Sequence, residues 1–122
     1  MTVKECYEAM GADYDDVMGR LRKDERVQKF LLKVLDDKSF ALLCSSLESR
    51  DMAEAFRAAH TMKGVSQNLS LMRLYHSANE MSELLRDRQD YGADIEPVLE
   101  KVREDYELTI ACIKQLAESA QA

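Results

Sequence analysis

Apolar residues recur along most of the chain at intervals of three and four positions, with polar residues between them. This spacing is typical of amphipathic helices, whose apolar side chains share one face. The stripes are Val27, Phe30, Leu31, Val34 and Leu35; Phe40, Leu43 and Leu47; Ala55, Ala58, Met62, Val65 and Leu69; Leu71, Leu74, Ala78, Met81 and Leu85; and Ile95, Val98, Leu99, Val102, Tyr106, Ile110, Ile113 and Leu116. No segment alternates strictly enough between apolar and polar residues to predict a strand.

Residues with capping chemistry stand near the expected helix starts. Thr2 and Glu5 have the spacing of a capping box, in which a hydroxyl and a carboxylate bind exposed backbone N–H groups. Further candidate caps are Asp13, Asp24, Ser39, Asp51, Ser70 and Asp94. Pro97 falls in the first turn of the last helix, where its missing N–H needs no partner.

These patterns predict an all-α fold, an antiparallel four-helix bundle over about residues 24–120 with additional short N-terminal helices over about residues 1–22. A length of 122 residues fits a single domain, residues 1–122, and 46% of its residues are hydrophobic, enough for one core. Four glycines and one proline favour few, long elements. The one obvious loop is residues 88–93.

The formal net charge is −6, and an acidic protein has no general attraction for nucleic-acid phosphates or anionic lipid. We therefore expect neither as a partner. No stretch approaches the roughly 18 apolar residues of a membrane span, and the N-terminus lacks the apolar run of a signal peptide. Cys6, Cys44 and Cys112 lie far apart in helical patterns, so we expect reduced thiols, no metal site and a cytoplasmic protein.

His60 lies opposite the apolar stripe of its helix when residues 51–69 are placed on a helical wheel. A buried core histidine therefore fits poorly, whereas a lone surface histidine remains an alternative. Lys63 lies one turn away on the same face, and Gly64 stands in mid-helix, where glycine costs about 1 kcal/mol relative to alanine. Phe56 adds a large apolar side chain to this otherwise exposed face, as an interface would need.

The chemistry of this face is consistent with phosphoryl transfer. A neutral imidazole is a nucleophile at physiological pH. A phosphoryl group on His60 would be dianionic, and Lys63 would offset that charge, with Arg57 as a further cation. No acidic residue lies on this face of the helix, so the sequence predicts a locally basic site on an acidic protein.

The segment from Ala58 to Leu69, AAHTMKGVSQNL, resembles the histidine-containing phosphotransfer (HPt) family. The family pattern is alanine–histidine, two residues, lysine–glycine, and then asparagine–leucine–glycine. The resemblance is specific near His60 and extends over roughly Gly11 to Ala120. It implies a four-helix bundle in which His60 is the phosphoacceptor, Lys63 steadies the phosphoryl group and Gly64 leaves room for a partner.

The resemblance also implies that response-regulator receiver domains are the partners, with a hybrid sensor histidine kinase as a further candidate. We predict that they dock on Phe56, Arg57 and Ala59. The receiver supplies the phosphoaspartate and Mg²⁺, so this chain itself needs no bound cofactor and binds no metal. It is expected to be a phosphocarrier rather than an enzyme, and it contains no glycine-rich nucleotide-binding segment. We expect a monomer.

The sequence departs from the family pattern at two positions. Ser70 follows Asn68-Leu69 where the family has glycine. Ser82 matches the position of a Glu or Gln that faces the histidine ring in many members, and serine would reach it only through water. The candidate supporting residues are Gln67, Asn79, Ser82 and Arg86.

The leading interpretation is a phosphorelay intermediate that takes a phosphoryl group from a receiver aspartate and passes it to another receiver. A pseudo-HPt module that docks on receivers without carrying phosphate is one alternative. A phosphoacceptor domain of a histidine-kinase assembly is another. The most remote alternative is a structural bundle in which the His-Lys-Gly combination is accidental.

Overall fold

The described part of this computed structural model, residues 1–121, consists of seven helices and contains no strand. The helices are α1 (Val3–Met10), α2 (Tyr14–Leu21), α3 (Asp24–Val34), α4 (Ser39–Glu48), α5 (Met52–Asn68), α6 (Met72–Leu85) and α7 (Ile95–Gln121). The prediction of an all-helical fold is confirmed. No helix within these residues is long and apolar enough to cross a membrane.

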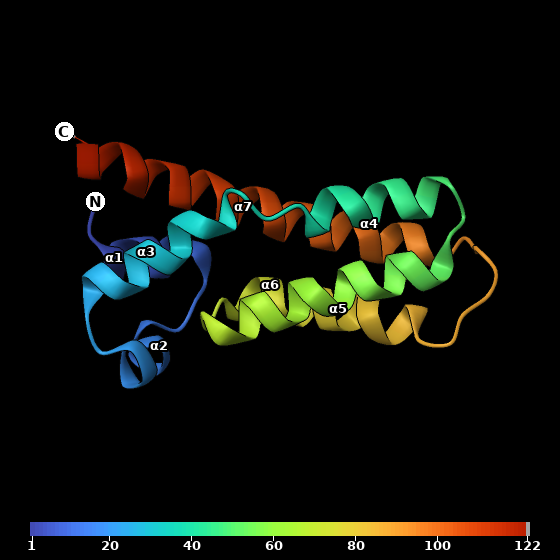
Figure 1. Cartoon of the computed structure of the whole chain (residues 1–122), viewed down its shortest axis with the longest axis horizontal. Coiled ribbons are helices and arrows are strands. Elements are labelled where there is room, and N and C mark those ends of the chain that lie inside the picture. The colour runs from blue at the N-terminus through green and yellow to red at the C-terminus, as the bar shows by residue number, and fades with distance from the viewer. Residues whose placement is uncertain (122) are drawn as a thin grey trace.

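Helices α4, α5 and α6 pack with the N-terminal half of α7 as a four-helix bundle whose successive helices are antiparallel (Figure 1). Helices α1, α2 and α3 form a second group at the other end of the molecule (Figure 1). The bundle itself thus begins at Ser39, whereas the sequence interpretation began it near residue 24. The apolar stripe of α7 explains the difference, because it continues past the bundle and needs α1 and α3 to cover it.

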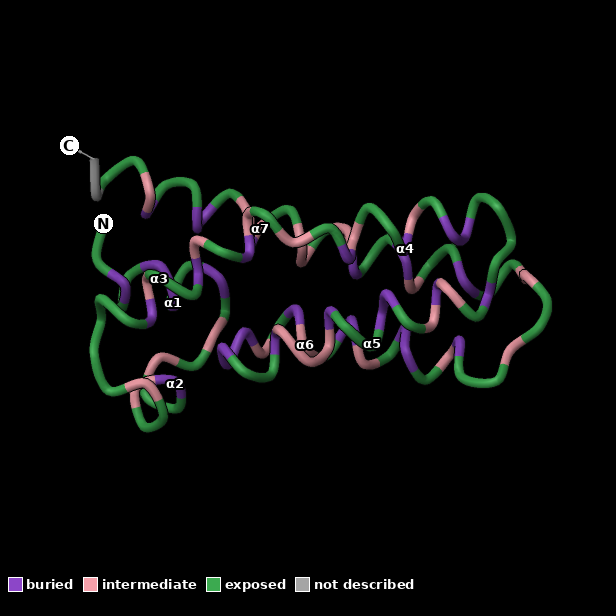
Figure 2. Tube along the Cα trace, in the orientation of Figure 1, coloured by how far each residue is buried: buried purple, intermediate pink, exposed green. Residues whose placement is uncertain are grey.

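The core is continuous between the two groups of helices. Buried positions lie on the sides of the helices that face one another, both in the bundle and in the N-terminal group (Figure 2). Cys6 and Tyr7 of α1 are fully buried, and the Cys6 Sγ lies 3.5 Å from the backbone oxygen of Cys112 on α7. The Tyr7 hydroxyl donates a 2.8 Å hydrogen bond to the backbone oxygen of Leu69. Helix α1 therefore ties α7 to the C-terminal end of α5.

The helix starts follow capping chemistry at three of the predicted positions. Thr2 and Glu5 form the reciprocal capping box at α1. Asp13 and Asp51 each accept a hydrogen bond from the backbone N–H three residues ahead. These side chains satisfy N–H groups that have no partner inside the helix.

Other predicted caps lie in different places. Asp24 and Ser39 are the first residues of α3 and α4, so Lys23 and Lys38 occupy the cap positions and make no side-chain cap bond. Ser39 instead donates its hydroxyl to Asp37 over 2.8 Å. Acidic and hydroxyl side chains are favourable in a first helical turn as well as at the cap, which makes the exact start hard to read from sequence.

Ser70 joins α2 to the turn between α5 and α6. Its φ of +56° lies in the left-handed region, where glycine is the unstrained residue and where the family pattern has glycine. The buried hydroxyl donates to Asp16 Oδ2 over 2.6 Å and accepts from Arg20 Nη2 over 2.6 Å. Arg20 also donates to the backbone oxygen of Asn68 over 2.9 Å, and the Asp13 N–H donates to the Ser70 backbone oxygen. The serine thus offsets its backbone strain with hydrogen bonds to α2.

Candidate functional site

Helix α5 presents His60 to solvent on the side opposite its packed face. The residues of α5 that are buried are Met52, Ala55, Ala58, Ala59, Met62 and Ser66. His60 and the adjacent Thr61 are exposed, which is where the helical wheel placed the histidine. The apolar stripe of α5 therefore fixes the helix against α4 and α6 and leaves the imidazole accessible.

A short aromatic and cationic stack accompanies His60. The Phe56 ring lies one turn earlier, with its centroid 5.8 Å from that of His60 and the two planes 24° apart. The Arg86 guanidinium of α6 lies over the Phe56 ring at 5.2 Å. Phe56 is half-buried, so it is held in place and still offers part of its ring to solvent. The stack connects the α5 site to the C-terminal end of α6.

Lys63 and Gly64 continue the same face of α5. Both are half-buried. A methyl group added at Gly64 would meet no atom within 4 Å outside its own stretch of helix. The fold of this chain therefore does not require glycine here. Glycine in mid-helix even lowers the stability of the helix relative to alanine. The open space at Gly64 lets another molecule approach the α5 backbone closely.

An acidic residue that the sequence analysis did not single out lies beside this site. Glu83 of α6 pairs with Arg86 over 2.9 Å, and both side chains are about half exposed. The hydrogen bond and charge of Arg86 lower the pKa of Glu83 most, and the positive charge of Lys63 and the protonated form of His60 lower it further. The neighbouring helix α6 therefore places an acidic residue beside the basic face that the sequence predicts on α5. A sequence signal for Glu83 exists, because it directly follows Ser82, the residue expected to face His60 from the neighbouring antiparallel helix.

Arg57 is also paired with an acidic residue. It forms an ion pair with Glu54 one turn earlier on α5, and this pairing raises the pKa of the Arg57 guanidinium. The Arg57 side chain is 63% exposed and remains available to a partner. Thr61 donates its hydroxyl to the backbone oxygen of Arg57 over 3.0 Å, so this flank of the site is internally bonded.

Two predicted site residues are buried. Ala59 is 0% exposed, because the residue before His60 is turned by about 100° toward the packed side of α5. The prediction that Ala59 contacts a partner is not compatible with this position. Ser82 is also 0% exposed, and its hydroxyl has no hydrogen-bond partner in the described residues.

The remaining supporting residues lie around the site at different depths. Gln67 is exposed on α5 two turns beyond His60. Asn79 is half-buried on α6. Arg86 is exposed at the end of α6, where its charge is held by Glu83. Arg86 is connected to His60 through the Phe56 ring, which lies against both side chains.

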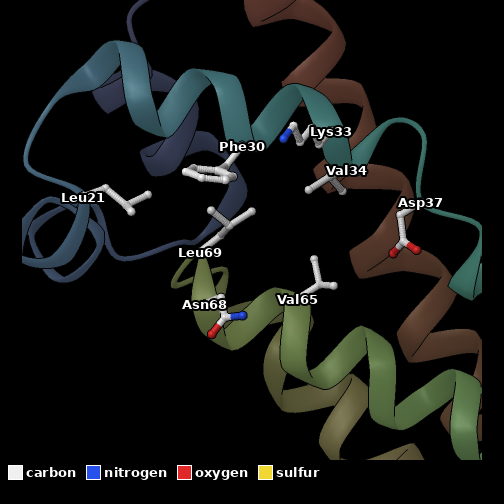
Figure 3. A pocket seen from close by; sticks show the side chains of 8 residues that line it. All are labelled: Leu21, Phe30, Lys33, Val34, Asp37, Val65, Asn68 and Leu69. Atoms are coloured by element: carbon white, nitrogen blue, oxygen red, sulfur yellow. The ribbon is translucent and has the colours of Figure 1, made fainter.

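A hollow of about 380 Å³ lies between α3 and the C-terminal turns of α5 (Figure 3). The residues that line it are Leu21, Phe30, Lys33, Val34, Asp37, Val65, Asn68 and Leu69. Its lining is mainly apolar and does not include His60. No cluster of His, Cys, Asp and Glu in residues 1–121 has the arrangement of a metal site.

A helical bundle that displays an accessible histidine, here His60, beside a lysine and an open glycine is the arrangement expected of a histidine phosphocarrier. The family model "Hpt domain" matches residues 27–121, so the chain belongs to the Hpt domain family. Comparisons with curated proteins and with solved structures found no match. As an Hpt domain, the chain functions in histidine phosphotransfer within phosphorelays, is a phosphocarrier rather than a classical enzyme, and interacts with receiver domains of two-component systems.

Proposed function

We propose that this chain is a phosphorelay intermediate that accepts a phosphoryl group on His60 from a receiver aspartate and passes it to another receiver. The observation that supports this most strongly is the exposed His60 in the middle of a firmly packed helix. Lys63 and the open backbone at Gly64 lie on the same face. A nucleophile needs this combination of access and fixed orientation.

The transfer would need little covalent chemistry from this chain. A lone pair on one imidazole nitrogen attacks the phosphorus, and the bond from phosphorus to the aspartyl oxygen breaks. The aspartate leaves as a carboxylate. The phosphorylated imidazole then loses its extra proton or keeps it, according to pH. Positioning and charge stabilisation account for most of the catalysis in such a loose transition state.

Each neighbour of His60 has a distinct part in this proposal. Lys63 offsets the charge of the phosphoryl group, and Arg86 is a second cation that can turn toward it. Phe56 and Arg57 contact the receiver around the site. Gly64 permits its close approach. Mg²⁺ belongs to the receiver, and this chain contributes no metal ligand to it.

The partners in this proposal are receiver domains, including that of a hybrid sensor histidine kinase. We propose that the chain acts as a monomer in the cytoplasm, the compartment typical of Hpt signalling. Its three cysteines are free thiols, as a reducing compartment would keep them. One receiver at a time would occupy the single exposed histidine face of α5.

The test is transfer of labelled phosphate from a phosphorylated receiver. The purified protein should acquire acid-labile, base-stable label, and His60→Gln should acquire none. His76→Gln is the matched control, because His76 is the other histidine and is also exposed. Binding without label would contradict a carrier role and favour the docking module. Label that appears only with a kinase and ATP would favour the kinase-assembly alternative.

A further inference from the structure

We propose that Glu83 is a positioning residue that opposes phosphorylation of His60, so that the loaded protein gives up its phosphoryl group readily. Glu83 would do this in two ways, by holding Arg86 and by placing a negative charge beside the phosphoryl group. This inference rests on the proposed function, because it concerns the charge state of the same site. It assigns a role to a residue that the family pattern does not include.

The contacts around His60 form a connected set. His60 stacks on Phe56, the Arg86 guanidinium lies over the same Phe56 ring, and Arg86 pairs with Glu83. Two hydrogen bonds join Arg86 to the two Glu83 carboxylate oxygens, at 2.9 and 3.4 Å. Lys63 and the protonated form of His60 also lower the pKa of Glu83, after the larger effect of Arg86. The Glu83 carboxylate is therefore paired directly with Arg86 and lies near Lys63 and His60.

The ion pair between Glu83 and Arg86 is suited to exchange. It joins Glu83 in the last turn of α6 to Arg86 just past the end of the helix, both side chains are about half exposed, and exposed ion pairs contribute little to stability. A phosphoryl group carries a charge of about −1.5 to −2 and three strong acceptor oxygens. Arginine binds phosphate through paired, charge-assisted hydrogen bonds that are stronger than ordinary ones. Phosphorylation of His60 would therefore draw Arg86 away from Glu83.

Once Arg86 has moved, Glu83 is left close to a second negative group. Like charges repel, and at a partly exposed site this repulsion is reduced by water and salt without being abolished. The free energy of the phosphorylated state is raised both by breaking the Arg86 pair and by this repulsion. In the unphosphorylated state the Glu83–Arg86 pair is intact and there is no phosphoryl group to repel. Glu83 therefore shifts the equilibrium away from phosphohistidine and toward the receiver.

The experiment measures how phosphate is shared between this protein and one receiver domain at equilibrium. Phosphoramidate loads His60 independently of any receiver, since the imidazole nitrogen attacks phosphorus and ammonia leaves as the old P–N bond breaks. Wild type is compared with Glu83→Gln and Arg86→Gln. Glu80→Gln is the matched control, because Glu80 is another exposed glutamate of α6 but pairs with Lys101 of α7.

The proposal predicts that Glu83→Gln raises the equilibrium ratio of phosphohistidine to phosphoaspartate by about three- to tenfold at low salt, with a smaller effect at high salt. Arg86→Gln should lower the ratio, and Glu80→Gln should leave it unchanged. A Glu83→Gln ratio equal to wild type would overturn the inference. A lower ratio would also overturn it, since Glu83 would then support the loaded imidazole. Wild type that accepts phosphate from neither donor would overturn the proposed function itself.

Discussion

At the scale of single residues, Gly64 separates what the fold requires from what the function requires. Gly64 and Gly19 both stand inside helices, and a methyl group at either would meet nothing within 4 Å outside its own helix. Neither glycine has a left-handed backbone, so neither is explained by conformational strain. Only Gly64 lies beside His60. The reason for glycine at position 64 is therefore expected to lie in a partner molecule.

The change Gly64→Ala should raise the free energy of unfolding by about 0.5–1 kcal/mol, because alanine loses less backbone entropy in a helix. It should also slow phosphoryl transfer from a receiver, because the methyl group obstructs its approach. Gly19→Ala is the control and should stabilise the protein without slowing transfer. Urea denaturation and transfer kinetics measure the two effects. Unimpaired transfer by the Gly64 variant would show that no partner approaches this position closely.

Ser82 and Glu83 show the limit of residue-by-residue prediction. The family pattern directed attention to Ser82, yet its hydroxyl is buried and unpartnered in the described residues, whereas the next residue carries an exposed carboxylate that pairs with Arg86. A rotation of 100° per residue separates the two side chains. Sequence spacing defines the angle between the two side chains, but it does not define how α6 is rotated about its own axis relative to α5. The same uncertainty affected Ala59, which directly precedes His60 and is buried.

At the scale of helices and turns, a hydrogen-bonded contact fixes α2 to the α5–α6 turn. The Ser70 hydroxyl bonds to Asp16 and Arg20, and the hydrogen bonds that Asp16 accepts from Ser70 and Arg20 lower its pKa. Sequence reasoning identified Ser70 as a departure from glycine and predicted a helix cap. It could not find the partners, because they lie about fifty positions away in the chain. Serine lacks the conformational freedom of glycine at this positive φ, and its hydrogen bonds to α2 compensate for that.

Two substitutions at Ser70 should separate strain from hydrogen bonding. Ser70→Ala should reduce the free energy of unfolding by about 1–3 kcal/mol, because it keeps the left-handed backbone and leaves the hydrogen bonds of the buried hydroxyl unmade. Ser70→Gly should be less destabilising, because glycine adopts the positive φ without strain. Chemical denaturation measures both. Equal stability of all three proteins would mean that the contact with α2 contributes nothing.

Helix α1 should make the protein sensitive to alkali. Burial raises the pKa of the Cys6 thiol from 9.0 to about 11, and it also raises the pKa of the Tyr7 hydroxyl. The pKa values of both groups are higher in the folded state than in the unfolded state. Their contribution to stability is therefore fully present below the unfolded-state pKa values and is lost as pH rises through the folded-state pKa values. The free energy of unfolding should fall as pH increases from about 9 to 11. Cys6→Ala should reduce this slope, and an unchanged slope would contradict the assignment.

At the scale of the whole molecule, helix α7 joins the bundle to the N-terminal group. The apolar periodicity correctly predicted an all-helical fold with a four-helix bundle and short N-terminal helices. It could not assign α3, whose stripe is equally suited to packing in the bundle or beyond it. The deciding feature is the length of α7, whose 27 residues extend past α4, α5 and α6 (Figure 1). Cys112, Ile113 and Leu116 on its later turns are buried.

Removal of residues 1–22 should destabilise the protein, although the family match begins only at residue 27. The truncated chain would lose the buried Val3, Cys6, Tyr7, Met10 and Val17 and expose the surface that they cover. Burial of one such side chain contributes about 1.5–3 kcal/mol, so the loss is large compared with the stability of a small domain. Thermal unfolding measures the change. An unaltered melting temperature would show that residues 23–122 are stable without the N-terminal helices.

The central claim, that His60 both accepts and passes on a phosphoryl group, is tested most directly by a chase experiment. The protein is loaded from one phosphorylated receiver, separated from it, and mixed with a second, unphosphorylated receiver. We predict about one phosphate per chain at His60, which then leaves as phosphoaspartate accumulates on the second receiver. Phosphate that stays on the protein, maps to another residue or never loads would contradict this account.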